Sequence, residues 1–453
     1  MSGKLRYTII FLSIFLLFIF MLEPKAKAEN VLSTQTSNLS IEDCIELAIT
    51  NNPSMAEKEL EVHIQEANVG VAFSEFFPEL KVESYYETWD DEHPYLPFNY
   101  TGDVDIQDVS PYYTSKESLV LSQPIYHGGE NFYRLKKAEA DLSSTVYDMK
   151  VRRLDLIYRV KRTYLDVLKS KKLLDIQMDN LYALRRNLEI AEFEFEEGAI
   201  NKIDLLDARK LLYEAMVETI KALDVYEYNI VKLNIIIGRK TNAPVILEDI
   251  KEIDMSKYSL PSKEEASIMA CLNRPEIFRV DSKIKSSQMN LKGIEAGYWP
   301  RLDLEGKYNF SQDEIKGDYE DWSVKFKVTL PVSESIKNVS KVKKAKAEML
   351  QTEIEKEKLK EVIDLEIQQS ISNLEESSIK LQTAQEKLKE AKEKFEILSF
   401  KKDQGLMSKR SFILSELDFN KIREDYVKAL HRYCLDRITF DRVISSVKTS
   451  VIF

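Results

Sequence analysis

Two stretches of the chain are too long and too uninterrupted to belong to an ordinary globular domain. Residues 130–197 and 332–404 run for 68 and 73 residues without a glycine or a proline, so neither contains the residues that usually break a helix. At about 1.5 Å per residue, the first stretch would form a helix roughly 100 Å long. We therefore expect two very long helices, and no compact globule needs elements of that length.

A heptad pattern in both stretches indicates that these helices pack as coiled coils. Positions seven apart alternate with a second series at the 3–4 spacing of a coiled-coil seam. The seam consists of Leu374, Ser377, Leu381, Ala384, Leu388, Ala391, Phe395 and Leu398, and in the first stretch of Val167, Ser170, Leu174, Gln177, Leu181, Leu184, Leu188 and Ala191. Charged residues make up 31% of the chain, with only 12 Gly and 12 Pro, which also favours long helices with polar faces.

The spacing of prolines and glycines shows that the chain contains two tandem repeats. The intervals Pro53–Pro78 and Pro275–Pro300 are both 25 residues, and the intervals Pro124–Gly198 and Pro331–Gly405 are both 74 residues. The halves therefore superpose with an offset of 222 and then of 207, because the first half has 15 extra residues in one loop. Such internal repetition at fixed spacing indicates two copies of one structural unit.

The same arrangement of elements is expected in each repeat. Repeat 1 covers residues 29–240, and a linker at 241–261 joins it to repeat 2 at 262–453. Each repeat opens with a helix capped by Ser40 or Ser262 and ended by a proline. Two strands and a long helical hairpin follow. The expected strands are residues 79–87, 113–123, 301–310 and 323–330.

The expected strands of repeat 2 alternate between apolar and charged residues, the period of a strand with two different faces. One face contains Leu302, Leu304, Tyr308, Phe310, Val324, Phe326 and Val328. The other contains Arg301, Asp303, Glu305, Lys307, Lys325 and Lys327. Taken alone, such a strand more often belongs to a soluble sheet, because the pattern of a membrane barrel is weak in any single segment.

The N-terminus adds the context of an exported protein. Lys4 and Arg6 precede the apolar run 7–22, and Ala26-Lys27-Ala28 resembles a cleavage site. We interpret residues 1–28 as a signal peptide, with an uncleaved anchor as the alternative. Cleavage would leave a formal charge of −14, since four bases and one acid are removed from a chain of charge −11. That charge argues against nucleic acid as a main partner.

Four exported strands with an apolar face pose a structural problem in a membrane. The smallest closed barrels have about eight strands, and open sheet edges are not tolerated in lipid. If these strands cross a membrane, several chains must each contribute strands to one barrel. The apolar face would then contact lipid, and the charged face would line a water-filled lumen.

The motifs and their order resemble the TolC-like outer membrane efflux protein family from about Ser40 to Ser445. The resemblance depends on the repeat, on "AITNNP" and "CLNRP", on "FFPEL" and "YWPRL", on "SQPIYHGG", and on "GAINKIDLLDA". It implies a mainly α fold with a small β part and a homotrimer in the cell outer membrane. Three chains with four strands each would share a 12-stranded transmembrane β-barrel, and paired helices would form a coiled-coil α-helical barrel that extends into the periplasm.

The resemblance further implies a porin-like channel-tunnel of a tripartite efflux or type I secretion system. Substrate would leave passively, and an inner-membrane pump and a periplasmic adaptor would supply the energy. The helix turns with Gly198, Asn201, Gly405 and Ser408 lie farthest from the expected strands, so they would contact these partners. Alternatively, they are plain hairpin turns. The two glycines at His127 would ease the turn from strand to helix.

The sequence has two positions at which an acidic gate of the channel could lie. The family commonly has an acidic pair after the second helix turn, where this chain has Ser411 and Leu414. Asp204 and Asp207 follow the first turn instead. They are three residues apart and can share one helix face, so they could form carboxylate rings in a trimer. Alternatively, they are solvated residues that favour a helix N-terminus.

Two other classes of function were considered. A periplasmic coiled-coil scaffold or adaptor without its own pore would account for export and heptads, but not for two copies of a strand–loop–strand unit. An enzyme is not expected, because the four histidines, His63, His93, His127 and His431, show no metal-binding spacing and no nucleophile elbow is present. No cofactor or metal is expected. The three cysteines form no paired framework and are interpreted as small buried residues.

Overall fold

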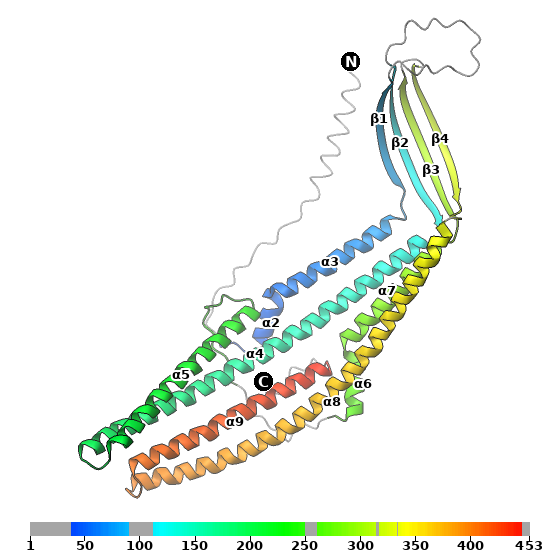
Figure 1. Cartoon of the computed structure of the whole chain (residues 1–453). Coiled ribbons are helices and arrows are strands. Elements are labelled where there is room, and N and C mark those ends of the chain that lie inside the picture. Colours follow the sequence, from blue (N-terminus) through cyan, green and yellow to red (C-terminus); the bar gives the residue numbers. More distant parts are fainter. Residues whose placement is uncertain (1–37, 90–111, 250–260, 314–316, 333, 446–453) are drawn as a thin grey trace, which may run out of the picture. The chain divides into compact units, whose positions relative to one another are not determined.

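A computed structural model of the chain describes residues 38–89, 112–249, 261–313, 317–332 and 334–445. The predicted signal peptide therefore lies outside the described residues. All helices and strands below belong to the unit that begins at Leu39. Figure 1 shows the four strands side by side and the long helices paired with shorter returning helices.

The same order of elements occurs twice. The first copy contains α2 (Ile41–Asn51), α3 (Pro53–Ser74), β1 (Glu79–Trp89), β2 (Tyr112–His127), α4 (Glu130–Glu196) and α5 (Lys202–Ile236). The second contains α6 (Lys263–Asn273), α7 (Pro275–Ala296), β3 (Arg301–Asp313), β4 (Gly317–Thr329), α8 (Glu334–Asp403) and α9 (Lys409–Val443). The predicted fold class, mainly α with a small four-stranded β part, is confirmed.

Each copy has two helices before its strands, whereas the sequence analysis expected one. Pro53 and Pro275 end α2 and α6 as expected, but each also occupies the first position of another helix, α3 or α7. Proline is well suited to that position, because the amide hydrogen that it lacks would have no helical partner there. Asn52 supports the restart, since its side chain accepts a hydrogen bond from the Ser54 amide at 2.9 Å.

The opening helices begin where the cap residues predicted. Ser40 accepts a hydrogen bond from the amide of Asp43, whose carboxylate accepts one from the Ser40 amide, so both halves of a capping box are present. Ser262 and Glu265 form the same box at the start of α6. Two helices of equal length, 222 residues apart, therefore start in the same way.

The strands form one antiparallel sheet in the order β1-β2-β3-β4. Their bounds differ from the expected ones. β2 continues through Pro124 to His127, because a shift of register between Pro124 and Tyr126 accommodates the proline, which cannot donate to a sheet. β3 extends to Asp313 and β4 begins at Gly317. Most of residues 311–322, an acidic segment that lies between the expected strands, is therefore strand.

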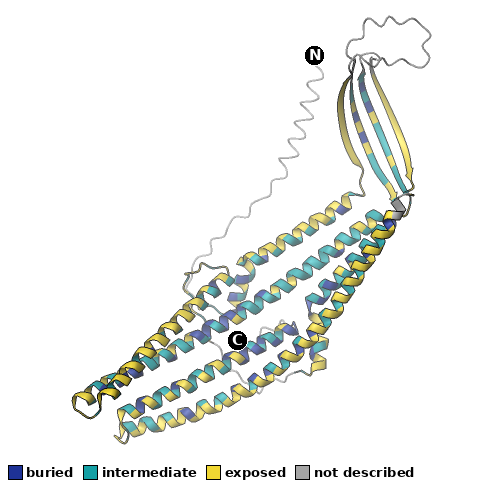
Figure 2. Ribbon diagram, viewed as in Figure 1, coloured by how far each residue is buried: buried dark blue, intermediate teal, exposed yellow. Residues whose placement is uncertain are grey.

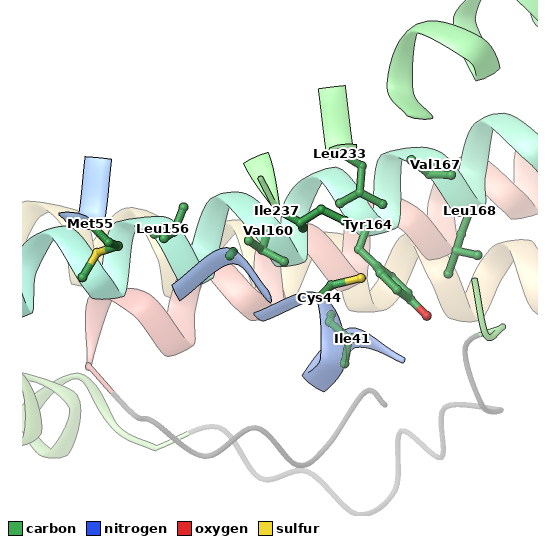
Figure 3. Packing of buried hydrophobic residues seen from close by; sticks show 11 residues of the cluster. Ile41, Cys44, Met55, Leu156, Val160, Tyr164, Val167, Leu168, Leu233 and Ile237 are labelled. Carbon is green, nitrogen blue, oxygen red and sulfur yellow. The ribbon is translucent and has the colours of Figure 1, made fainter. Parts of the chain in front are cut away.

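The helices of each copy enclose their own apolar core. One cluster joins α2, α4 and α5 with Met55 of α3, and Figure 3 shows Tyr164 and Cys44 lying against each other within it. The other cluster joins α6, α8 and α9 with Ile277 of α7. The clusters match residue by residue at the two offsets: Cys44 with Ala266, Ala48 with Ala270 and Met55 with Ile277, then Leu156 with Ile363, Val160 with Ile367, Val167 with Leu374, Leu233 with Phe440 and Ile237 with Ile444.

The expected coiled-coil seam is the packed side of both long helices. None of its sixteen positions is exposed, and Leu381, Leu374, Ala191 and Val167 are almost fully buried. Period-seven spacing therefore identified the packed face correctly.

A second interface between α4 and α9 joins the two copies. Leu165 packs with Cys434 and Ile438. Polar pairs extend this interface on both sides, with Arg186–Glu416 at 2.7 Å, Arg423–Asp179 at 2.8 Å and Arg442–Asp155 at 2.6 Å. The two helical hairpins thus lie side by side through α4 and α9.

A further pair between α4 and α9, His431 with Asp166, is more enclosed than these three and makes stability depend on pH. His431 Nε2 lies 2.9 Å from Asp166 Oδ1. Burial alone raises the pKa of Asp166, but the hydrogen bond and charge of His431, with Lys232 and Arg162, outweigh burial, and the pKa lies below its ordinary 3.8. A carboxylate with a lowered pKa stabilises the fold above the ordinary value and loses this effect as the pH falls through the lowered one.

We expect Asp166→Asn to destabilise the protein at neutral pH by about 1–3 kcal/mol per chain, because the hydrogen bond with His431 then has no charged acceptor. Between about pH 5 and pH 2, the stability of the parent should fall more steeply than that of the variant, which has no carboxylate at this position to protonate. Thermal unfolding measured across this range tests both effects. Exposed Glu189 provides the control, and Glu189→Gln should shift stability by less than about 0.5 kcal/mol. Parallel pH profiles for the parent and Asp166→Asn would contradict the assignment.

Candidate functional site

One face of the sheet is apolar and exposed across all four strands. The register pairs Leu302 with Val328, Leu304 with Phe326 and Tyr308 with Trp322, and the apolar side chains therefore share one face. The face continues over β2 and β1 with Leu119, Leu121, Leu80, Val82 and Tyr86. Val82 is 70% exposed and Trp322 is 75% exposed. An exposed apolar surface that spans a whole sheet marks contact with a protein or a membrane.

The opposite face is polar, and its central side chains are buried. Ser118, Asn309 and Ser311 are 3%, 5% and 1% exposed. Figure 2 shows the buried positions on the two central strands and the exposed edge strands β1 and β4. A sheet in a soluble protein normally buries its apolar face, so this sheet has the reverse arrangement.

The structure places the predicted sheet residues on the expected opposite faces. The register pairs Asp303 with Lys327 and Glu305 with Lys325, and both pairs lie on the polar face with Arg301 and Lys307. Trp322 also lies on the apolar face, although the expected strand bounds began one residue after it. Continuing the alternation from Val324 by one more step would have found it.

The turn from β2 into α4 contains Gly128 and Gly129, with φ of 65° and 86°. A side chain at Gly128 would lie 2.4 Å from the carbonyl oxygen of Ala296, so only glycine fits there. The expected easing of this turn by glycines is confirmed.

A group of charged residues surrounds this junction of sheet and helix. His127 lies 2.7 Å from Asp303, and Arg301 lies 2.9 Å from Glu130. Arg134 bridges Glu130 and Glu75 at 2.7 and 2.6 Å. The Arg301–Glu130 pair ties the polar face of the sheet to the first turn of α4, and Arg134 ties α4 to the end of α3.

The turns between the long and the returning helices are built alike. Gly198 and Gly405 have φ of 70° and 69°, the left-handed conformation that ends many helices. Asn201 accepts hydrogen bonds from the amides of Ile203 and Asp204, and Ser408 accepts one from Ser411. Figure 1 shows these turns at the ends of the hairpins away from the strands.

The two aspartates of the suggested gate lie just beyond the first turn. Asp204 is half-buried in the first turn of α5, and Asp207 is exposed one turn later. Ser411 and the exposed Leu414 take the matching places in α9. Asp204 also lies where a carboxylate favours a helix N-terminus, so the arrangement is compatible with both interpretations of these residues.

Other kinds of site find little support in the part of the chain that the structure describes. No group of three or more His, Cys, Asp and Glu residues could hold a metal ion there. Among the described helices, none combines the length and hydropathy needed to cross a membrane.

The cysteines only partly match their interpretation as buried residues. Cys44 and Cys434 are buried, and burial raises the pKa of each thiol to about 12. Cys271 is exposed, so its interpretation as a buried residue was wrong, because it lies on the outer side of α6 while Ala266 and Ala270 face the core. All three thiols are free.

Comparison with known proteins gives one family and one fold. Residues 44–239 match the model of the family described as "Outer membrane efflux protein". Among curated proteins, the sequence comparison found no match. This description names transport out of the cell and no chemical reaction.

Solved structures of outer membrane channels share the fold at low sequence identity. The CmeC outer membrane channel of Campylobacter jejuni is 17% identical, with 93% of each chain covered and a TM-score of 0.76. The outer-membrane channel OprN is 13% identical, with 89% of each chain covered and a TM-score of 0.74. The open state of the MtrE outer membrane channel of Neisseria gonorrhoeae is 14% identical, with 92% of this chain and 93% of that chain covered and a TM-score of 0.69.

The family match covers the first repeat, and the fold shared with the solved structures covers most of both repeats. The reversed sheet and the paired long helices are the features that this fold would need at a membrane. The first repeat thus matches the outer membrane efflux protein family, and the whole chain has the fold of solved outer membrane channels.

Proposed function

We propose that this protein is the channel-tunnel of a tripartite efflux or type I secretion system. It would lie in the outer membrane, in keeping with the family that its first repeat matches, and its substrate would leave passively through the pore. An inner-membrane pump and a periplasmic adaptor would supply the energy. The observation that carries the proposal is the reversed sheet, whose apolar face is exposed while its polar centre is buried.

The open sheet edges support a homotrimer. β1 and β4 are the edge strands of a four-stranded sheet, and four strands cannot close a barrel. Unpaired edges in lipid would leave backbone groups without hydrogen bonds, at a cost of several kcal/mol each. Three copies with β1 of each paired to β4 of the next would give twelve strands and no edge.

The outer helices support the same assembly. α5 carries an apolar stripe on the side away from α4, and α8 carries a second one. The stripe on α5 contains Ile203, Leu206, Tyr213, Val217, Ile220, Tyr228 and Ile235, and that on α8 contains Ile354, Leu365, Ile379 and Ile397, all of them exposed. Stripes of this length on a water-soluble part of a protein favour burial against a partner, and in the proposed trimer that partner is the neighbouring chain.

The two faces of the sheet then have distinct roles. Leu302, Leu304, Tyr308, Phe310, Val324, Phe326 and Val328 would contact lipid, and Arg301, Asp303, Glu305, Lys307, Lys325 and Lys327 would line the lumen. This assignment rests on the shared faces described above and on the cost of placing charges in lipid.

The purified protein in neutral detergent tests the proposal. We expect an oligomer that survives sodium dodecyl sulfate without heating and three times the chain mass. Added to a planar bilayer, it should give stepwise conductance. A chain that is extracted without detergent and gives no conductance would instead be a periplasmic scaffold or adaptor.

The helix turns are the proposed contacts with the adaptor or pump. Gly198, Asn201, Gly405 and Ser408 lie in the exposed turns between the helices. Cysteine in place of Asn201 or Ser408 should form crosslinks to an adaptor in cells that are exporting substrate. Exposed Lys171, in the middle of α4, provides the control position. Equal crosslinking at all three positions would count against a contact at the turns.

We further propose that Asp204 and Asp207 form two stacked carboxylate rings at the periplasmic opening. Rings of acidic side chains attract and hold cations, so a trivalent cation on the periplasmic side should block conductance. The double variant Asp204→Ala, Asp207→Ala should abolish the block. Glu214, exposed farther along α5, provides the control in Glu214→Ala. If the double variant is blocked as tightly as the parent, these aspartates act only at the helix N-terminus.

A further inference from the structure

The junction between helix and strand is built alike in the two repeats. Asn131 Nδ2, in the first turn of α4, donates a hydrogen bond to the carbonyl oxygen of Glu75 at 3.0 Å. Asn338 Nδ2, in the first turns of α8, donates one to the carbonyl oxygen of Gly297 at 3.1 Å. The offsets of 207 and 222 relate these residues, so Gly297 occupies the place of Glu75 in the second repeat.

The charges at these matching places differ. In the first repeat Arg134 is neutralised by Glu75 at 2.6 Å and Glu130 at 2.7 Å. In the second repeat the residue that matches Arg134 is Lys341, while Gly297 and Lys337 take the places of the two carboxylates. Among the described residues, no carboxylate lies within 4.0 Å of the Lys341 ammonium. The second repeat thus keeps the cation and lacks both of its counter-ions.

A cavity opens where the missing carboxylate would lie. It has a volume of about 370 Å³, in the range of small-molecule sites. Its lining includes four basic residues, Arg134, Lys137, Arg301 and Lys341, and only Glu130 as an acid. Met289, Ile294 and the ring of Tyr133 supply apolar surface, and Asn290 and Asn338 supply polar groups.

We infer that this cavity binds an organic anion, with a carboxylate or phosphate group beside Lys341 and an apolar body against Met289 and Ile294. The anionic group takes the position that the Glu75 carboxylate has in the first repeat. Glu75 and Glu130 together balance Arg134 and Arg301. Lys341 therefore leaves the lining positive, and an anionic group is attracted.

The position of the cavity connects it with export. Arg301 lies on the polar face of the sheet with Asp303 and Glu305, and the cavity therefore opens on the side that the proposed function assigns to the lumen. The inference rests on that proposed function: the site would hold an exported amphiphilic anion at the passage from helical tunnel to barrel.

Binding of hexyl phosphate to the whole trimer in neutral detergent, measured by titration calorimetry, tests the inference. The parent should bind hexyl phosphate and hexanoate, and hexanol should not compete. Lys341→Gln should weaken binding by about tenfold or more, the effect of losing one charged hydrogen bond. Lys344→Gln is the matched control one turn along α8, since Lys344 is 78% exposed, and it should change binding by less than about twofold.

A second variant keeps the test decisive if Lys341→Gln does not assemble. Gly297→Glu supplies the missing carboxylate from the chain itself, as Glu75 does in the first repeat, and should weaken binding similarly. The Asn338 side chain, whose Nδ2 would lie 2.9 Å from the new Cβ, must shift to make room for it. No binding to a parent that conducts in a bilayer would overturn the inference but leave the channel intact. A parent without conductance would contradict the proposed function instead. Anionic phospholipid that co-purifies with the parent and is lost in Lys341→Gln would assign the cavity to the bilayer and also overturn the inference.

Discussion

Replacing Val324 by Arg should abolish assembly of the protein in the outer membrane. Val324 lies near the middle of β4, is 65% exposed and shares the apolar face with Phe326 and Val328. An arginine near the bilayer midplane of a transmembrane barrel costs about 2–4 kcal/mol. A trimer bears this cost three times, which is comparable with the whole stability of many folded domains. We expect no oligomer resistant to sodium dodecyl sulfate in the outer membrane fraction.

The neighbouring residue provides a matched control. Ser323 precedes Val324 in the same strand and is also exposed, but it pairs with Lys307 on the polar face. Ser323→Arg should assemble to the parent's level, because a lumen residue remains in water. The faces would be assigned wrongly if Ser323→Arg were lost from the membrane while Val324→Arg assembled. If both variants failed to assemble, β4 would tolerate no large side chain at either position. If both assembled, the apolar face would not contact lipid.

The second large effect is expected in the coiled-coil seam. Leu381 is fully buried between α8 and α9, and Leu381→Ala should destabilise each chain by about 2–5 kcal/mol through lost apolar contact and the cavity left behind. The midpoint of thermal unfolding, followed by circular dichroism, should fall clearly below that of the parent, since every chain of the proposed trimer would have the defect.

Lys380, the preceding residue, provides the control for this prediction. Its ammonium pairs with Glu376 across one exposed helix turn, and exposed pairs contribute little to stability. Lys380→Ala should therefore change the stability of each chain by less than about 0.5 kcal/mol. Similar midpoints for the two variants would mean that the seam does not hold α8 against α9 as the structure indicates.

Local sequence patterns predict the kind of each long element and its packed side. Period-seven spacing predicts the buried side of α4 and α8, because every seventh residue returns to one face of a supercoiled helix. Alternation in β3 and β4 predicts two faces, because successive side chains point to opposite sides of a strand. Both patterns are local and periodic, so neither needs a folded structure to be recognised.

Element ends depended on neighbours that local patterns do not contain. Pro124 was expected to end a strand, but a register shift against β3 accommodates it inside β2. The acidic residues after Phe310 were expected in a loop, yet pairing of Asp313 with Gly317 extends both strands. A proline or a charge disfavours a strand on average, and ladder pairing with a partner overrides that preference.

Only the tertiary structure decided which residues meet across the two repeats. The sequence shows Arg134 and Lys341 as matching positions, but it does not show that Glu75 reaches Arg134 while a cavity opens beside Lys341. Nor does it show that α4 packs on α9, where Leu165 meets Cys434. These contacts join residues more than 50 positions apart, and they form because each helix must bury a second face that its own hairpin leaves uncovered.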